Sequence, residues 1–235
     1  MKYRVEDMEF TCNFKYEKML SRGKKFISCD GDNDSYKLEI TEQEMCNKML
    51  AFDNIAEDQK EVISSAQIYF VKALEYNRIL LHAAAVSVSG YAYLFFAPPS
   101  GGKSILARNW KKILGNECIV FADDSPIISK EKGETYTWNS CCSKITEEGT
   151  PLKHKLHGVC IIHKTNKECN DITPIFYKEA AALVSNGYPE GLFRNRVYYM
   201  LIEYLREIPC WEYYYDGSVE ASKRSVKEMV GTYAE

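Results

Sequence analysis

The chain contains, at residues 94–104, the stretch LFFAPPSGGKS, in which an apolar segment precedes a loop of small residues and a lysine. A strand, a tight loop and a helix in this order can bind phosphate, because N–H groups of the loop and of the helix N-terminus point at the anion. The pattern G-x-x-x-x-G-K-[ST] adds a lysine that reaches the outer phosphates and a hydroxyl that binds Mg²⁺. Lys103 and Ser104 occupy these two positions. The stretch predicts an ATP site formed by Ala97, Pro98, Pro99, Ser100, Gly101, Gly102, Lys103, Ser104 and Ile105.

The loop departs from this pattern at its first position, where Ala97 replaces a glycine. Pro98 and Pro99 stiffen the loop but remove two N–H donors. Taken alone, the stretch fits two interpretations equally well, a nucleotide site or a turn between a strand and a helix that happens to carry G-G-K-S.

Two adjacent aspartates favour the nucleotide site. Residues 118–122 form an apolar run that predicts a buried strand, and Asp123 and Asp124 follow it, twenty residues after Lys103. In P-loop enzymes a second strand beside the loop presents a carboxylate on the Mg²⁺ side. Adjacent carboxylates at a strand end often belong to a solvated turn, but the spacing from the loop favours a metal site that combines Ser104 with Asp123.

His82 lies in the apolar segment 79–88, which Ser89 and Gly90 separate from the apolar segment 91–96. This pattern predicts a β-hairpin that brings His82 back toward the loop. A histidine in an apolar strand is usually a core residue, whereas the hairpin places it near the phosphates. Both interpretations stay open at this point.

The rest of the chain indicates one domain of mixed secondary structure. Apolar periodicity predicts helices over 55–78, 103–114, 177–184, 195–207 and 219–230. Strands are predicted over 118–122, 127–128, 135–138, 156–162 and 211–215, with short strands within 3–40. Without strict βαβ alternation, we expect an α/β fold with a mixed sheet. The length of 235 residues predicts a single domain, with N-terminal strands and a helix over 1–78 and the P-loop core over 79–235.

Composition excludes several classes of partner. The chain has 30 basic and 33 acidic residues, so no basic surplus indicates binding to nucleic acid or to an anionic membrane. The N-terminus lacks the pattern of a signal peptide, and polar residues and prolines interrupt the apolar stretch 79–99, so no membrane span is expected. Nine cysteines without a C-x-x-C pair suit a reducing cytoplasm.

Four potential zinc ligands recur every third residue, namely His154, His157, Cys160 and His163. A strand sends residues three apart to opposite faces, so the four side chains cannot converge. The ligand pairs of a typical zinc site are also missing. The sequence therefore argues against zinc.

Residues 80–125 resemble HPr kinase/phosphorylase and its shorter kinase relatives. The resemblance is carried by LHAAAV at 81–86, the turn at Gly90, the loop through Ser104 and the sequence ADD at 122–124. The interval of fifteen residues between His82 and Ala97 is also that of the family's motif. The resemblance implies the fold of HPr kinases and phosphoenolpyruvate carboxykinases, in which the P-loop lies in a mixed sheet with helices packed around it.

The resemblance also implies residue roles. Lys103 and Ser104 hold phosphate and Mg²⁺, and Asp124 accepts the proton of the substrate hydroxyl with support from Asp123 and His82. Arg194, in an Arg-Asn pair like that of the family, touches the phosphate from the far side, although Arg196 competes for this match.

One departure concerns the reverse, phosphate-removing reaction. The family's Glu-x-Arg-Gly signature falls on Lys155-Leu156-His157-Gly158, so its acidic Mg²⁺ partner and its arginine are missing. The positive charge of Lys155, in place of the family's carboxylate, would repel Mg²⁺. We therefore expect a kinase that works only in the forward direction.

Three functions are consistent with these features. The first is an ATP- and Mg²⁺-dependent kinase that phosphorylates a serine or threonine hydroxyl of a small protein or peptide. The sequence leaves open whether the protein forms a homo-oligomer. The second is a non-catalytic nucleotide sensor, which the Ala97 and Lys155 departures favour and the two aspartates oppose. The third, a decarboxylating carboxykinase, needs a second large domain for its acid substrate, and 235 residues leave no room for one.

Overall fold

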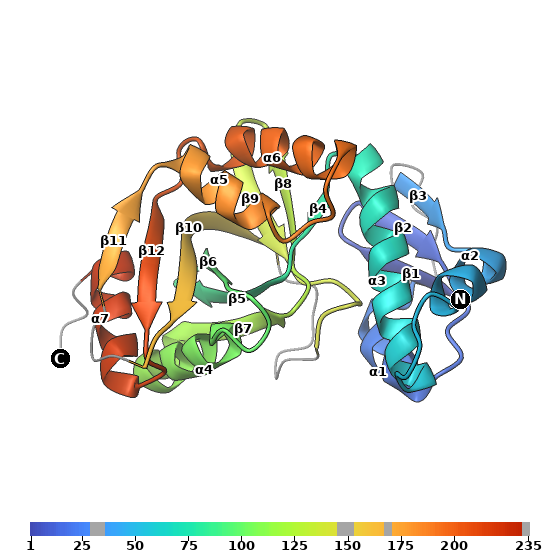
Figure 1. Cartoon of the computed structure of the whole chain (residues 1–235), viewed down its shortest axis with the longest axis horizontal. Coiled ribbons are helices and arrows are strands. Elements are labelled where there is room, and N and C mark those ends of the chain that lie inside the picture. The colour runs from blue at the N-terminus through green and yellow to red at the C-terminus, as the bar shows by residue number, and fades with distance from the viewer. Residues whose placement is uncertain (29–35, 145–152, 167–170, 232–235) are drawn as a thin grey trace.

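The computed structural model describes residues 1–28, 36–144, 153–166 and 171–231, which form two β-sheets with helices around them (Figure 1). The smaller sheet has the order β1-β2-β3, with strands β1 (Lys2–Val5), β2 (Met8–Thr11) and β3 (Tyr36–Glu39). Helices α1 (Glu17–Gly23), α2 (Glu42–Met49) and α3 (Glu57–Glu75) and a 3-10 turn (Lys24–Phe26) accompany it. The predicted short strands and the long helix are present, but α1 and α2 were not predicted.

Both missed helices are short, at seven and eight residues, so a periodic pattern has little room to appear. For α2 a local signal exists, because Thr41 and Glu44 form a capping box in which each side chain bonds the other residue's backbone N–H.

The larger sheet is mixed. Its strands follow the order β4-β8-β9-β10-β6-β5-β7, with β12 also beside β10 and β11 beside β12. Strand β10 runs parallel to β6 and β12, and the other pairs are antiparallel. The strands are β4 (Ile79–Leu80), β5 (Ala83–Val88), β6 (Tyr91–Phe96), β7 (Cys118–Asp123), β8 (Ile127–Glu131), β9 (Glu134–Trp138), β10 (Lys153–Lys164), β11 (Ile172–Ile175) and β12 (Cys210–Tyr215). The mixed α/β architecture predicted from the sequence is confirmed.

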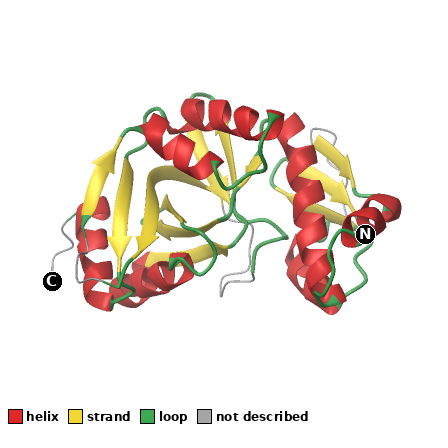
Figure 2. Cartoon of the chain, viewed as in Figure 1, coloured by secondary structure: helices red, strands yellow, loops and turns green. Residues whose placement is uncertain are grey.

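Helices cover both faces of this sheet (Figure 2). On one face, α4 (Lys103–Leu114) and α7 (Val219–Val230) pack on a core that includes Trp110 and Tyr213. On the other face, α5 (Tyr177–Ser185) and α6 (Leu192–Leu205) pack on a second core. A 3-10 turn, Gly115–Glu117, joins α4 to β7. No helix in the described ranges is long and apolar enough to cross a membrane.

The two sheets share a hydrophobic core. It combines side chains of the first 78 residues, such as Phe10 and Tyr69, with Trp138 and Cys142 from the second sheet and the loop after it. An ion pair between Asp7 and Arg78 also joins the two ends of the N-terminal segment. Helix α3 contributes Tyr69 to this core, and other residues of α3 line the cavity that His82 and Asp124 also line.

The predicted strand 79–88 is wrong in one respect, because the chain bends at His82 and divides it into β4 and β5. Strand β4 pairs with β8, while β5 lies between β6 and β7. The bend occurs because Leu81 donates its N–H to Pro126 O, outside the β5 ladder. As a result of this bend, His82 lies outside both strands and is exposed.

Candidate active site

The strand register brings three predicted segments to one edge of the larger sheet. Strand β5 is antiparallel to both β6 and β7, so its first residues lie beside the last residues of its two neighbours. Ala83 lies opposite Phe96, and Ala84 lies opposite Asp123. His82, the loop after β6 and the aspartates after β7 therefore meet at this edge, although up to 42 residues separate them in the sequence.

The loop after β6 has a tight backbone. Ser100 and Gly102 have positive φ values of 61° and 104°. A Cβ on Gly101 would lie 2.6 Å from the Cβ of Ala97, so this position requires glycine. Ala97 is not among the residues with positive φ in the described ranges, and its backbone therefore has no need for glycine. The departure at the first position of the pattern is compatible with the loop geometry.

The loop leads into the N-terminus of α4, which begins at Lys103. Gly102 is the N-cap residue and has no side chain that could cap the helix. The N–H groups of the first helical turn, which have no acceptors within a helix, are consequently available to an anion. Leu106 and Trp110 are fully buried and anchor the helix to the sheet.

Lys103 directs its ammonium group back into the loop. Its Nζ donates to Ala97 O at 2.8 Å and to Pro98 O at 3.5 Å, and the residue is only 7% exposed. Burial lowers the pKa of Lys103, while the nearby Asp124 and Asp123 oppose this change. The ammonium group thus lies on the inner side of the loop.

Ser104 and Asp123 form an oxygen pair that suits Mg²⁺. Ser104 Oγ donates to Asp123 Oδ1 at 2.7 Å. Two neighbouring ligands in an octahedral Mg²⁺ shell lie about 3.0 Å apart, so both oxygens could bind one ion after a small adjustment. Lys144 Nζ lies 4.0 Å from Asp123 Oδ2 and gives this carboxylate a positive neighbour. The sequence did not single out Lys144, because a lone lysine after a strand carries no pattern.

Asp124 and His82 form the second polar pair of the site. His82 Nε2 and Asp124 Oδ1 are 3.0 Å apart. The hydrogen bond from His82 lowers the pKa of Asp124, and Lys144 and Lys103 add to this effect against desolvation. The His82 side chain is 54% exposed, so the interpretation as a core histidine is wrong.

The backbone of Asp124 adopts a φ of 97°, which is rare for a residue with a side chain. The Asp124 N–H is bonded to Ala83 O at 2.9 Å, which ties this conformation to the start of β5. Strained positions of this kind occur often at functional sites. The conformation separates the two carboxylates, so that Asp123 faces Ser104 while Asp124 faces His82.

Arg194 is not brought to the loop. Its Nε and Nη2 donate to Tyr188 O, and Nη1 contacts Glu190. Arg196, the competing match, donates to Leu74 O. Neither side chain forms a hydrogen bond or an ion pair with the loop or the aspartates within the described chain, and a direct role of Arg194 on phosphate stays a prediction.

Lys155 and His157 lie at the far end of the sheet. Lys155 pairs with Tyr91 in the parallel register of β10 and β6, whereas the loop follows Phe96, five residues on. Five residues of strand span about 17 Å. Lys155 forms an ion pair with Glu134, and His157 packs against the rings of Tyr91 and Tyr93. The expectation that Lys155 repels Mg²⁺ at the site is wrong, so it no longer supports a forward-only reaction.

The other members of the series of potential zinc ligands have separate surroundings. His154 contacts Ser87 and the ring of Phe121, Cys160 is fully buried, and His163 contacts Glu212. Burial lowers the pKa of His154 and raises that of Cys160.

The fold is that of a mixed α/β protein in which one edge of the larger sheet brings together Lys103, Ser104, the two aspartates and His82. No family model matches the chain. No curated protein matches it either. Among solved structures, the HPr(Ser) kinase/phosphatase from Coxiella burnetii is similar over 65% of this chain and 93% of that chain, with 11% identity and a TM-score of 0.38. A similarity at this level indicates only a distant structural relationship, so the function is inferred from the residues of the site.

Proposed function

We propose that the protein is a Mg²⁺- and ATP-dependent kinase that transfers the γ-phosphate to a serine or threonine hydroxyl of a small protein or peptide. Its main support is the convergence, at one uncapped helix N-terminus, of Lys103, the Ser104–Asp123 pair and the Asp124–His82 pair. Phosphoryl transfer requires charge neutralisation, a metal site and a residue that positions the nucleophile, and these groups supply all three.

Each residue then has one task. The first turn of α4 and Lys103 bind the phosphates and offset the charge that develops on the leaving oxygen. Ser104 and Asp123 hold Mg²⁺, which when bound neutralises charge on the phosphate oxygens. Asp124 orients the acceptor hydroxyl and takes its proton as the new O–P bond forms and the bond between the γ-phosphorus and the ADP oxygen breaks. His82 holds the Asp124 carboxylate in place.

The direct test supplies the protein with γ-labelled ATP, Mg²⁺ and a mixed library of serine and threonine peptides. Labelled phosphate should appear on peptides, and chelation of Mg²⁺ should stop the transfer. Calorimetry on the same protein measures Mg²⁺-ATP binding. Binding without any transfer would instead identify a nucleotide sensor, and the absence of both would contradict the proposal.

Replacement of His82 by alanine should move the acid limb of the pH–rate profile to higher pH. The hydrogen bond from His82 is the largest cause of the lowered Asp124 pKa, so its loss raises this pKa, although Lys103 and Lys144 still lower it. The ionised carboxylate is the active base, and activity is lost as the pH falls through its pKa. A higher pKa therefore causes the loss at higher pH.

The measurement is kcat/KM for peptide phosphorylation as a function of pH. His157→Ala is a matched control, because this exposed histidine lies at the opposite end of the sheet. Its profile should coincide with that of the unmodified protein. If His82→Ala shows the same acid limb as this control, Asp124 is not the titrating base.

A further inference from the structure

His82 and Asp124 are among the residues that line a cavity of about 640 Å³. Helix α3 forms one wall of this cavity, with Ile63, Ala66 and Phe70, and the segment 187–193 forms another. The Phe70 ring stacks on Tyr188 with centroids 5.1 Å apart, and Tyr188 OH donates to Leu80 O at 2.9 Å. These contacts fix a largely apolar cavity next to the proposed base.

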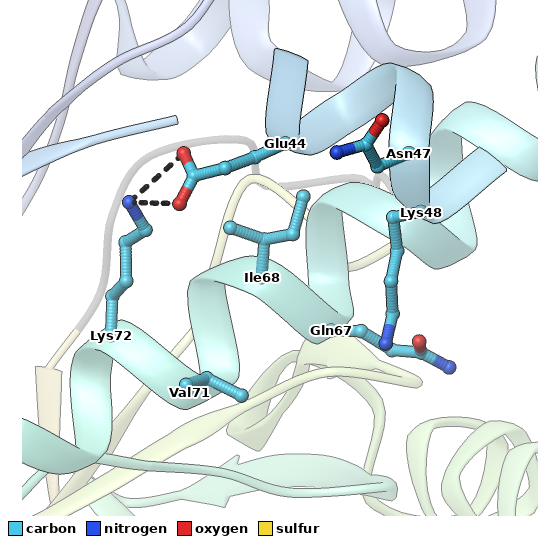
Figure 3. A pocket seen from close by; sticks show the side chains of 7 residues that line it. All are labelled: Glu44, Asn47, Lys48, Gln67, Ile68, Val71 and Lys72. Atoms are coloured by element: carbon cyan, nitrogen blue, oxygen red, sulfur yellow. Dashed lines mark hydrogen bonds and ion pairs between the residues drawn. The ribbon is translucent and has the colours of Figure 1, made fainter. Parts of the chain in front are cut away.

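A second recess of about 370 Å³ lies between α2 and α3 (Figure 3). Lys48, Gln67 and Val71 line both spaces, so the two spaces adjoin each other, and we refer to them together as the groove. Val71 and Phe193, which both line the larger cavity, are 41% and 45% exposed despite their apolar side chains. The groove therefore offers mostly apolar surface in both of its parts, and Glu44, Lys48 and Lys72 bring charged groups to the part between α2 and α3.

The two lysines of the second recess differ in their partners. Lys72 Nζ lies 2.8 Å from Glu44 Oε1, and the dashed lines in Figure 3 mark this pair. Lys48 extends from α2 toward Gln67 on α3, and it has no hydrogen-bond or ion-pair partner in the described part of the chain. Lys48 thus supplies an unpaired positive charge to the lining of both spaces.

We propose that this groove binds the acceptor as an extended peptide, with a large apolar side chain next to the acceptor hydroxyl and a carboxylate farther along the peptide at Lys48. The inference rests on the proposed kinase function. The second recess beside the apolar cavity favours a peptide over a small alcohol, which would occupy the cavity alone. The apolar walls beside Asp124 favour an apolar neighbour of the hydroxyl, because its burial there removes apolar surface from water.

The first test compares serine peptides that differ only in the residue next to serine. A leucine neighbour should give kcat/KM values about tenfold to a hundredfold higher than a glycine neighbour, the range expected for burial of one such side chain. An aspartate neighbour should be the poorest substrate. Equal values for leucine, glycine and aspartate would overturn the apolar part of the proposal.

The second test moves one aspartate or one lysine through successive positions of the leucine-containing peptide. At the position that reaches Lys48, the unmodified protein should prefer aspartate over lysine by about twofold to fivefold, as expected for an exposed ion pair. The Lys48→Glu variant should reverse this preference. The Lys227→Glu variant makes the same charge change on the exposed side of α7 and should keep the original preference. If Lys48→Glu and Lys227→Glu behave alike, the carboxylate site at Lys48 is wrong.

A binding measurement separates this inference from the kinase function. Fluorescent peptides with alanine in place of the acceptor serine are titrated with the protein, and anisotropy gives their Kd values. The same leucine and aspartate preferences should appear in binding. If they appear without phosphate transfer to the serine peptides, the groove stands and the kinase function fails. If transfer occurs but neither binding nor transfer depends on these residues, the kinase function stands and the groove proposal is overturned.

Discussion

The Asp124→Asn variant is expected to transfer phosphate about 10²–10⁴-fold more slowly than the unmodified protein, the usual contribution of a general base. Asparagine has nearly the same shape and can still contact His82, but it cannot accept the proton of the attacking hydroxyl. The nucleotide groups are elsewhere, at Lys103 and at the Ser104–Asp123 pair. Mg²⁺-ATP affinity, measured by calorimetry, should therefore change little.

The neighbouring aspartate is the matched control for this variant. Asp123→Asn removes one charge from the Ser104 side of the site, so it should increase the Mg²⁺ concentration needed for half-maximal rate. Different responses of the two variants would separate the base from the metal ligand. A normal transfer rate in Asp124→Asn would show that the base is another group, and His82 would be the next candidate.

The parts of the site that the sequence predicted have strong local signals. Helix α4 spans the predicted residues 103–114, because its apolar positions are periodic and Gly115, with a φ of 57°, ends it. The turn between β5 and β6 also follows from local chemistry. Ser89 and Gly90 both have positive φ values, 51° and 85°, as a two-residue hairpin turn requires.

The parts that the sequence did not predict depend on contacts between distant segments. The position of Lys155 at the far end of β6 follows from the register of β10, which no short pattern encodes. The ion pair of Lys144 with Asp123 arises because the segment after β9 forms a β-bridge to Asp123. The bend at His82 likewise depends on the bond from Leu81 to Pro126 O.

The groove could not have been inferred from the sequence for the same reason. Its walls come from α2, α3, the residues after β7 and the segment 187–193. These segments approach one another because the two sheets share a core that contains Tyr69 of α3 together with Trp138 of β9. The predicted P-loop residues belong to one continuous stretch, whereas the groove exists only after the N-terminal sheet and the larger sheet have packed together.

The Lys103→Ala variant is expected to bind Mg²⁺-ATP about tenfold to a hundredfold more weakly, the effect of losing a hydrogen bond to a charged group, and to lose most of its turnover. Lys103 is the only cationic side chain within residues 97–105, so no other lysine or arginine of the loop can replace it. The substitution also leaves Ala97 O without the Nζ donor that now lies 2.8 Å away, which removes one contact that closes the loop.

Two measurements distinguish loss of the phosphate contact from loss of the fold. Lys112→Ala removes an exposed lysine near the other end of α4, and it should retain the affinity of the unmodified protein in calorimetry. Thermal unfolding followed by circular dichroism should give similar Tm values for both alanine variants. Lys103→Arg keeps the positive charge but needs more room than the buried site allows, so its affinity should lie between those of the unmodified protein and Lys103→Ala. If Lys103→Ala binds Mg²⁺-ATP and transfers phosphate as well as Lys112→Ala does, the loop at 97–104 is not the nucleotide site.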